Sequence, residues 1–262
     1  MNGTRTGFDP RVHGFAFGNS WTFDEVERRD LPDQFATHLI RRGLLGPLGP
    51  SLIPLAVRLL RGSLERHLAP GYGLCGGMCF VALDFYWAGL PLPRGAAADD
   101  QPPPGTRLRT YIWQRQLDSL VDDGARFVAW LVRLNHVPRL WPLRGGLAGL
   151  LARSQEEWRE LRASLDAGAP VPIGLVRETG DVYDNHQVLA IGYEETDGAH
   201  GAVHVYDPNC PDAESVIHLD FGERSLRGRE SCGAGPPLRG FFCETYAPHD
   251  PAGIIAPQSQ TV

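Results

Sequence analysis

The pattern of apolar and polar positions changes about two thirds of the way along the chain. In the first part, apolar residues recur at helical spacing in four segments, which cover residues 52–68, 75–88, 107–135 and 154–168. Ser154 and Glu157 match a capping box, which predicts a helix start near residue 154. In the second part, short β-rich runs separated by turn residues cover residues 171–176, 187–193, 202–206 and 240–246. Helices followed by strands predict an α+β fold in which N-terminal helices pack on one C-terminal antiparallel sheet.

The segments outside these elements divide the chain into three parts. Residues 1–50 look irregular, with aromatic residues between Gly and Pro, and we interpret them as an extended arm packed on the core by its rings. Residues 51–250 are expected to form the main domain, and residues 251–262 a flexible tail. Residues 91–105 (PLPRGAAADDQPPPG) predict a loop, either a surface connection or a lid.

The charge composition argues against two classes of partner. The net charge is −6, and all 25 positive charges are Arg without any basic run, so a nucleic-acid partner is not expected. The N-terminus lacks the apolar stretch of a secretory signal, and the most apolar region, residues 44–60, is broken by three prolines and one Arg. We therefore expect a cytoplasmic protein without a membrane partner.

The five cysteines are expected to be free thiols, because their number is odd and no signal peptide precedes them. They are Cys75, Cys79, Cys210, Cys232 and Cys243. Structural zinc is the competing interpretation for a cysteine pair. CxxxC, however, is not the usual CxxC half-site, and no second close pair accompanies it. We therefore expect no cofactor and no metal ion, and consider the thiols as reactive groups.

Cys75 has the sequence context of an activated thiol. It stands at the mouth of an apolar helix, where free backbone N–H groups and the helix dipole favour an anion and hence the thiolate form. Gly76 and Gly77 follow, and they would allow a substrate carbonyl to approach closely. A buried structural cysteine is the alternative interpretation.

His186 and Asp207 are expected to meet as the base and the orienting acid. His186 stands at the start of one predicted strand, and Asp207 stands at the end of the next, just before Pro208. If the two strands form a hairpin, the start of one lies beside the end of the other. A carboxylate at that position can fix the tautomer of the imidazole and support its protonated form.

These three segments together resemble the papain-like cysteine peptidases. The features are a Cys-Gly pair that opens an apolar helix, a strand of the form His-x-Val-x-x-Ile-Gly-Tyr, and a strand that ends in Asp-Pro. The pattern most resembles the branch of bacteriocin leader peptidases and their stand-alone relatives, over residues 71–88 and 171–209. The resemblance implies a papain-like fold and a bacterial hydrolase with Cys75 as nucleophile, His186 as general base and Asp207 as orienting acid.

Two departures from that family keep alternatives open. The family usually carries a Gln shortly before the nucleophile that donates to the oxyanion, and the stretch HLAPGYGL has none, although His67 or an amide from elsewhere would substitute. Cys79 is a rival thiol, because CGGMC resembles the papain signature with one residue inserted; we favour Cys75, which is nearer the helix start.

The reaction implied by these residues is acyl transfer through a thioester. The expected partner is a peptide or amide substrate that is hydrolysed. An acyltransferase or transpeptidase, and a catalytically inactive binding protein, are the alternatives. The sequence does not indicate an oligomeric state.

Overall fold

The computed structural model describes residues 2–41, 54–55, 57–59, 61–62, 72–97, 99–134, 146–178, 185–222, 225–233 and 235–255. Of the helix expected over residues 52–68, the described positions are helical. The remaining positions of that segment, His67 among them, lie outside the described residues.

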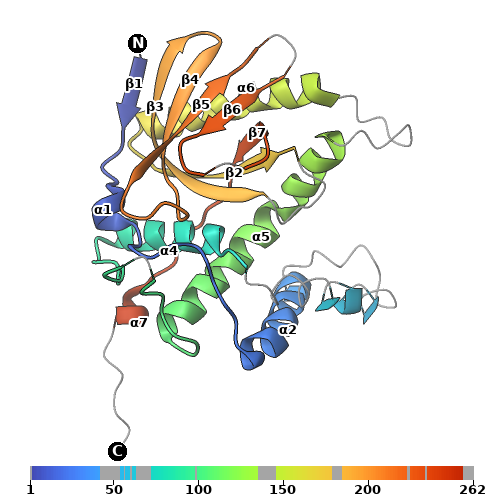
Figure 1. The fold of residues 1–262 in the computed structure, drawn as a ribbon, viewed down its shortest axis with the longest axis vertical. Coiled ribbons are helices and arrows are strands. Elements are labelled where there is room, and N and C mark those ends of the chain that lie inside the picture. The colour runs from blue at the N-terminus through green and yellow to red at the C-terminus, as the bar shows by residue number, and fades with distance from the viewer. Residues whose placement is uncertain are drawn as a thin grey trace, which may run out of the picture.

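Seven antiparallel strands form one sheet that closes on itself (Figure 1). They are β1 (Asn2–Arg5), β2 (Val171–Arg177), β3 (His186–Asp197), β4 (His200–Tyr206), β5 (Glu214–Asp220), β6 (Arg227–Glu230) and β7 (Leu238–Cys243). The order is β1-β3-β2-β7-β6-β5-β4, and a further pairing of β3 with β4 closes β2 to β7 into a six-stranded barrel. Strand β1 is an additional strand on β3.

The papain-like arrangement of helices packed on one sheet is therefore wrong, because the strands close into a barrel. Closure depends on β5 and β6, which the sequence pattern did not reveal. In β6 no residue is fully buried, so it carries no alternating apolar signal. Register shifts between Ala190 and Gly192 in the β3–β4 pair, and between Val176 and Arg177 in the β2–β7 pair, mark bulges that bend the strands.

The helices of the described segments lie outside the barrel. They are α1 (Pro10–His13), α2 (Glu25–Arg41), α4 (Cys75–Ala88), α5 (Arg107–Leu134), α6 (Gly146–Asp166) and α7 (Ala252–Ile255). Helix α4 runs across one end of the barrel, below it in Figure 1, and packs on α5. The predicted capping box is wrong, because α6 begins eight residues earlier and Ser154 is buried within it. In the described part of the chain, no helix combines the length and apolarity that crossing a bilayer requires.

The first eight residues of β3 are buried on both faces and separate two apolar cores. Val188 and Ala190 belong to a core that also contains residues of α6, β2, β4, β5 and β7. Leu189 and Ile191 face the second core, which contains α4, part of α5 and the rings of the N-terminal arm. The period-two alternation of β3 therefore connects the barrel to α4.

The N-terminal arm is built into this second core. The aromatic side chains expected to anchor it are buried there, namely Phe8, Phe15, Phe17, Trp21 and Phe23. The arm is less irregular than expected, since it also forms β1 and α2. The Arg109 guanidinium pairs with Glu27 at 2.5 Å and lies over the Trp21 ring, so the arm is fixed to α5.

A buried ion cluster fixes the segment after β7 against α4 and α5. Arg115 Nε lies 2.8 Å from Asp84 Oδ2, and Arg115 Nη1 lies 2.7 Å from Asp118 Oδ2. The Tyr246 hydroxyl and the His249 backbone N–H both donate to Asp84 Oδ1, at 2.7 and 2.9 Å. The cluster joins elements that are remote in sequence.

Two of the five cysteines form a disulfide, so the expectation of free thiols throughout is wrong. Cys210 follows β4 and Cys232 follows β6, with 6.0 Å between their Cα atoms. Both β4 and β6 run antiparallel to β5, so their C-terminal ends lie at the same end of the barrel. The missed strands β5 and β6 are the reason that the sequence did not indicate this pairing.

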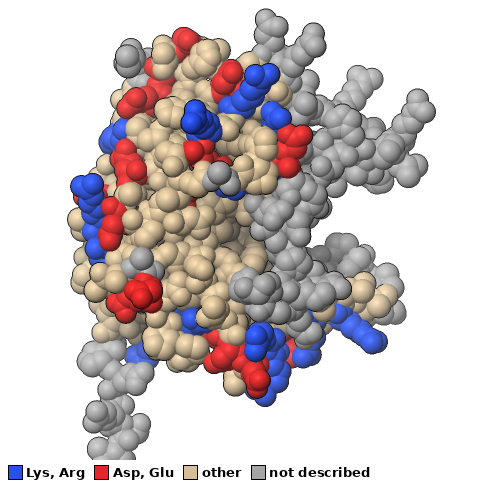
Figure 2. Space-filling model, viewed as in Figure 1, with Lys and Arg blue, Asp and Glu red and all other residues tan. Residues whose placement is uncertain are grey.

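The charges on the face shown in Figure 2 are mixed. Arg and acidic side chains alternate around a broad uncharged centre. On the described part of this face no continuous basic surface is visible, whereas a nucleic-acid-binding protein usually presents one.

Candidate functional site

The hairpin of β3 and β4 brings His186 and Asp207 together. Leu189 pairs with Tyr206 in the register of this hairpin, so the first residue of β3 and the residue after β4 lie at the same end. His186 Nε2 is 2.7 Å from Asp207 Oδ1, and the two residues are only 5% and 2% exposed. The predicted meeting of these side chains is found in the structure.

Asn209 completes the turn around this pair. Its backbone N–H donates to Asp207 Oδ1 at 2.8 Å, and its side-chain amide lies 3.1 Å from His186 Nε2. Because Nε2 is occupied on this side, Nδ1 is the ring nitrogen that remains for a reaction partner.

Cys75 is the first residue of α4 and the reaction partner that the structure offers to His186. Cys75 is 8% exposed, and its thiol lies close enough to the imidazole to raise the pKa of His186. The helix start has no side-chain cap at Leu74, so backbone N–H groups of the first turn face the thiol end of the helix. The structure thus brings together all three residues that the sequence singled out.

The surroundings of His186 favour the imidazolium form. Burial is the largest influence and acts to lower its pKa, but the Asp207 carboxylate and Cys75 together outweigh it and raise the pKa to about 10. His186 is therefore protonated at neutral pH.

Cys79 has the surroundings of a structural thiol. It is fully buried, and its Sγ lies 3.8 Å from the carbonyl oxygen of Gln187. Burial raises its pKa well above the usual value, and the nearby Cys75, Glu244 and Asp207 raise it further. A thiol that stays protonated is a poor nucleophile, so the geometry favours Cys75.

Gly76 and Gly77 have a packing role that differs from the one expected. A Cβ at Gly76 would lie 2.1 Å from Gln187 Oε1 and 2.3 Å from Ser119 Oγ. A Cβ at Gly77 would lie 2.2 Å from the carbonyl oxygen of Ile112. The glycines therefore let β3 and α5 approach the start of α4, and the space beside them is filled by protein.

A buried polar network behind the thiol was not anticipated from the sequence. Gln187 Nε2 donates to Glu244 Oε1 at 2.6 Å, which turns Gln187 Oε1 towards the Cys75 thiol at 3.9 Å. Gln116 Oε1 accepts a hydrogen bond of 2.8 Å from the Gly77 backbone. The position of Gln187 directly after His186 was the only signal available, since Gln116 and Glu244 come from remote elements.

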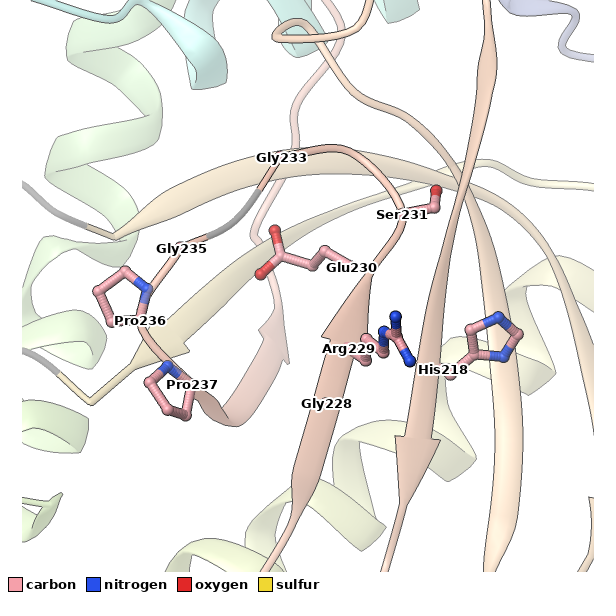
Figure 3. Close-up of a pocket in the computed structure, with 9 residues that line it drawn as sticks. All are labelled: His218, Gly228, Arg229, Glu230, Ser231, Gly233, Gly235, Pro236 and Pro237. Atoms are coloured by element: carbon pink, nitrogen blue, oxygen red, sulfur yellow. The ribbon is translucent and has the colours of Figure 1, made fainter.

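A cavity of about 600 Å³ lies beside β5 and β6 (Figure 3). Glu230 lines it and pairs with Arg177 at 2.5 Å. Burial raises the pKa of Glu230, whereas Arg177 and His186 lower it and Asp207 raises it. His218 also lines this cavity.

Within the described segments, no group of three or more His, Cys, Asp or Glu side chains is arranged to share a metal ion. In comparisons with known proteins, the chain matches no family model, no curated protein and no solved structure.

Proposed function

We propose that the chain catalyses cysteine-dependent acyl transfer, in which Cys75 attacks the carbonyl carbon of a peptide or amide and the acyl group is then released to water. The observation that carries the proposal is the buried His186–Asp207 contact of 2.7 Å beside the thiol at the start of α4. A buried charged pair is costly, and strongly perturbed groups gather at functional sites.

The proposed reaction starts from a thiolate on Cys75 and an imidazolium on His186. The Cys75 thiolate adds to the carbonyl carbon, and the imidazolium of His186 then gives its proton to the leaving amine as the C–N bond breaks. Neutral His186 next takes a proton from water, whose oxygen attacks the thioester, and the carboxylic acid leaves while Cys75 is regenerated. Asp207 holds the ring and stabilises its charged form throughout.

The oxyanion of each tetrahedral intermediate needs donors near the thiol. The backbone N–H groups of Cys75 and Gly76 are the ones we assign, because they begin α4 and the Gly77 N–H is already bonded to Gln116. This assignment replaces the upstream Gln that the sequence lacks, and it does not require His67.

The test is to trap the acyl-enzyme with p-nitrophenyl acetate. We expect a burst of p-nitrophenolate equal to the enzyme concentration and an acetyl group on the Cys75 peptide, removable by neutral hydroxylamine as a thioester is. Cys75→Ser should abolish both signals, and Cys79→Ser, the matched control one helical turn away, should retain them.

Acetylation of Cys79, or acetylation of Cys75 that is unchanged in His186→Ala, would contradict the proposal. Adding an amine acceptor decides the fate of the acyl group. Turnover that rises with amine concentration and gives the amide product identifies a transferase, whereas turnover indifferent to amine identifies a hydrolase.

A further inference from the structure

Asn19, in the N-terminal arm, contacts both segments that carry the candidate catalytic groups. Its Oδ1 accepts a hydrogen bond of 2.5 Å from the N–H of Leu74, the residue before the thiol. Its Nδ2 donates to Asn209 Oδ1 at 3.1 Å, and its backbone N–H donates to the carbonyl oxygen of Pro208 at 3.0 Å. A single residue thus joins the start of α4 to the turn that follows β4.

We infer that Asn19 is a positioning residue for acyl transfer, one that sets the placement of Cys75 relative to the His186–Asp207 pair. The inference rests on the proposed function. The thiol and the pair belong to separate elements, a helix and a hairpin, and productive geometry has to be held within about 0.5 Å. The two side-chain bonds of Asn19 act at this junction, next to the reacting groups on both sides.

The surroundings of Asn19 are shaped to hold it. A Cβ at Gly73 would lie 2.7 Å from Asn19 Nδ2, so a glycine is needed for the amide to lie against this backbone. Gln101 Nε2 donates to the carbonyl oxygens of Gly18 and Ser20, at 2.7 and 2.9 Å, on either side of Asn19. The Pro-rich loop therefore braces the arm at the site, which gives this loop a role in site geometry rather than that of a plain connection.

The experiment measures how fast iodoacetamide alkylates Cys75 across a range of pH in the full-length chain. Asn19→Ala removes both side-chain bonds and keeps the backbone bond to Pro208. We expect the pH midpoint of alkylation to rise by about one unit, which corresponds to an approximately tenfold slower reaction below the midpoint. Ser20→Ala, the matched control, keeps its carbonyl and should leave the profile unchanged. Unfolded chains would react as free thiols and also raise the midpoint, so the profile is measured only where the circular dichroism spectrum of each variant matches that of the wild type.

A double-mutant cycle tests the route of the effect. If Asn19 acts through the turn, Asn19→Ala and Asn209→Ala should shift the midpoint by less together than the sum of their separate shifts. A wild-type midpoint in Asn19→Ala, or additive shifts, would overturn the inference. If Asn19→Ala does not fold, Gln101→Ala loosens the same brace and should shift the midpoint in the same direction, and no shift there overturns it too. A wild-type profile that is already that of a free thiol and is unaffected by His186→Ala would instead overturn the proposed function itself.

Discussion

Asp207→Asn separates the charge of the buried pair from its shape. The amide is nearly isosteric with the carboxylate, so the packing around it is kept while the favourable interaction with the imidazolium is lost. Removing one partner of a buried ion pair costs about 3–5 kcal/mol. The raised pKa of His186 gives a free energy of the same order. The pKa rises from its ordinary value of 6.5 to about 10, and each pKa unit corresponds to about 1.4 kcal/mol.

The pH dependence of this loss has a definite sign. The folded-state pKa of His186 lies above its unfolded value, so its contribution to stability is fully present below pH 6.5 and is lost as pH rises through about 10. The wild type should therefore exceed Asp207→Asn by about 3–5 kcal/mol in free energy of unfolding at pH 6 and by less than about 1 kcal/mol at pH 10. Tyr111 and Tyr246, whose pKa values burial and Asp84 raise, are common to both proteins and cancel.

Urea unfolding at pH 6, 8 and 10 provides the assay. Asp197→Asn is the matched control, because Asp197 pairs with His200 at 2.9 Å but both side chains are more than half exposed. That substitution should change the free energy of unfolding by no more than about 0.5 kcal/mol at any of the three pH values. A difference between wild type and Asp207→Asn that stays constant or grows from pH 6 to pH 10 would show that the charge of His186 does not stabilise the pair.

Three further outcomes are expected. Cys79→Ala should retain labelling by a thiol-directed electrophile at neutral pH and Cys75→Ala should lose it, as followed by peptide mass spectrometry; label on Cys79 would reverse the assignment. Cys232→Ser opens a 22-residue loop closed by Cys210, so urea unfolding should show a loss of about 3 kcal/mol in free energy of unfolding, and alkylation of Cys75 should slow because the turn after β4 loses its tether. Arg115→Met leaves two buried carboxylates without their cation, so we expect a loss of about 3–5 kcal/mol in free energy of unfolding, while an unchanged melting temperature would show that the cluster contributes nothing.

The elements with strong periodicity were predictable from the sequence. The four predicted β-rich runs correspond to β2, β3, β4 and β7, and the apolar segment from Cys75 to Gly89 is a helix that ends at this glycine in a left-handed conformation. The meeting of His186 and Asp207 followed from the antiparallel pairing of consecutive strands alone. Local signals were sufficient for these features.

The features that depend on closure of the sheet were not predictable. Strand β6 reads Arg-Gly-Arg-Glu and pairs with β7 through Gly228 and Leu238, so neither its composition nor its length indicates a strand. Without it the sheet looked open, and the ends of β4 and β6, which carry Cys210 and Cys232, looked unrelated. Asn19 was missed for a related reason, since its partners are more than fifty residues away.

The most direct test of the catalytic assignment is the rate of Cys75 alkylation by iodoacetamide as a function of pH, followed residue by residue in the wild type and in His186→Ala. A free thiol ionises near pH ~8.5. We expect wild-type Cys75 to react with a midpoint well below that pH, and the midpoint to return to the free-thiol range in His186→Ala. A wild-type midpoint at or above ~8.5 that is unchanged in His186→Ala would show that Cys75 is not activated by His186.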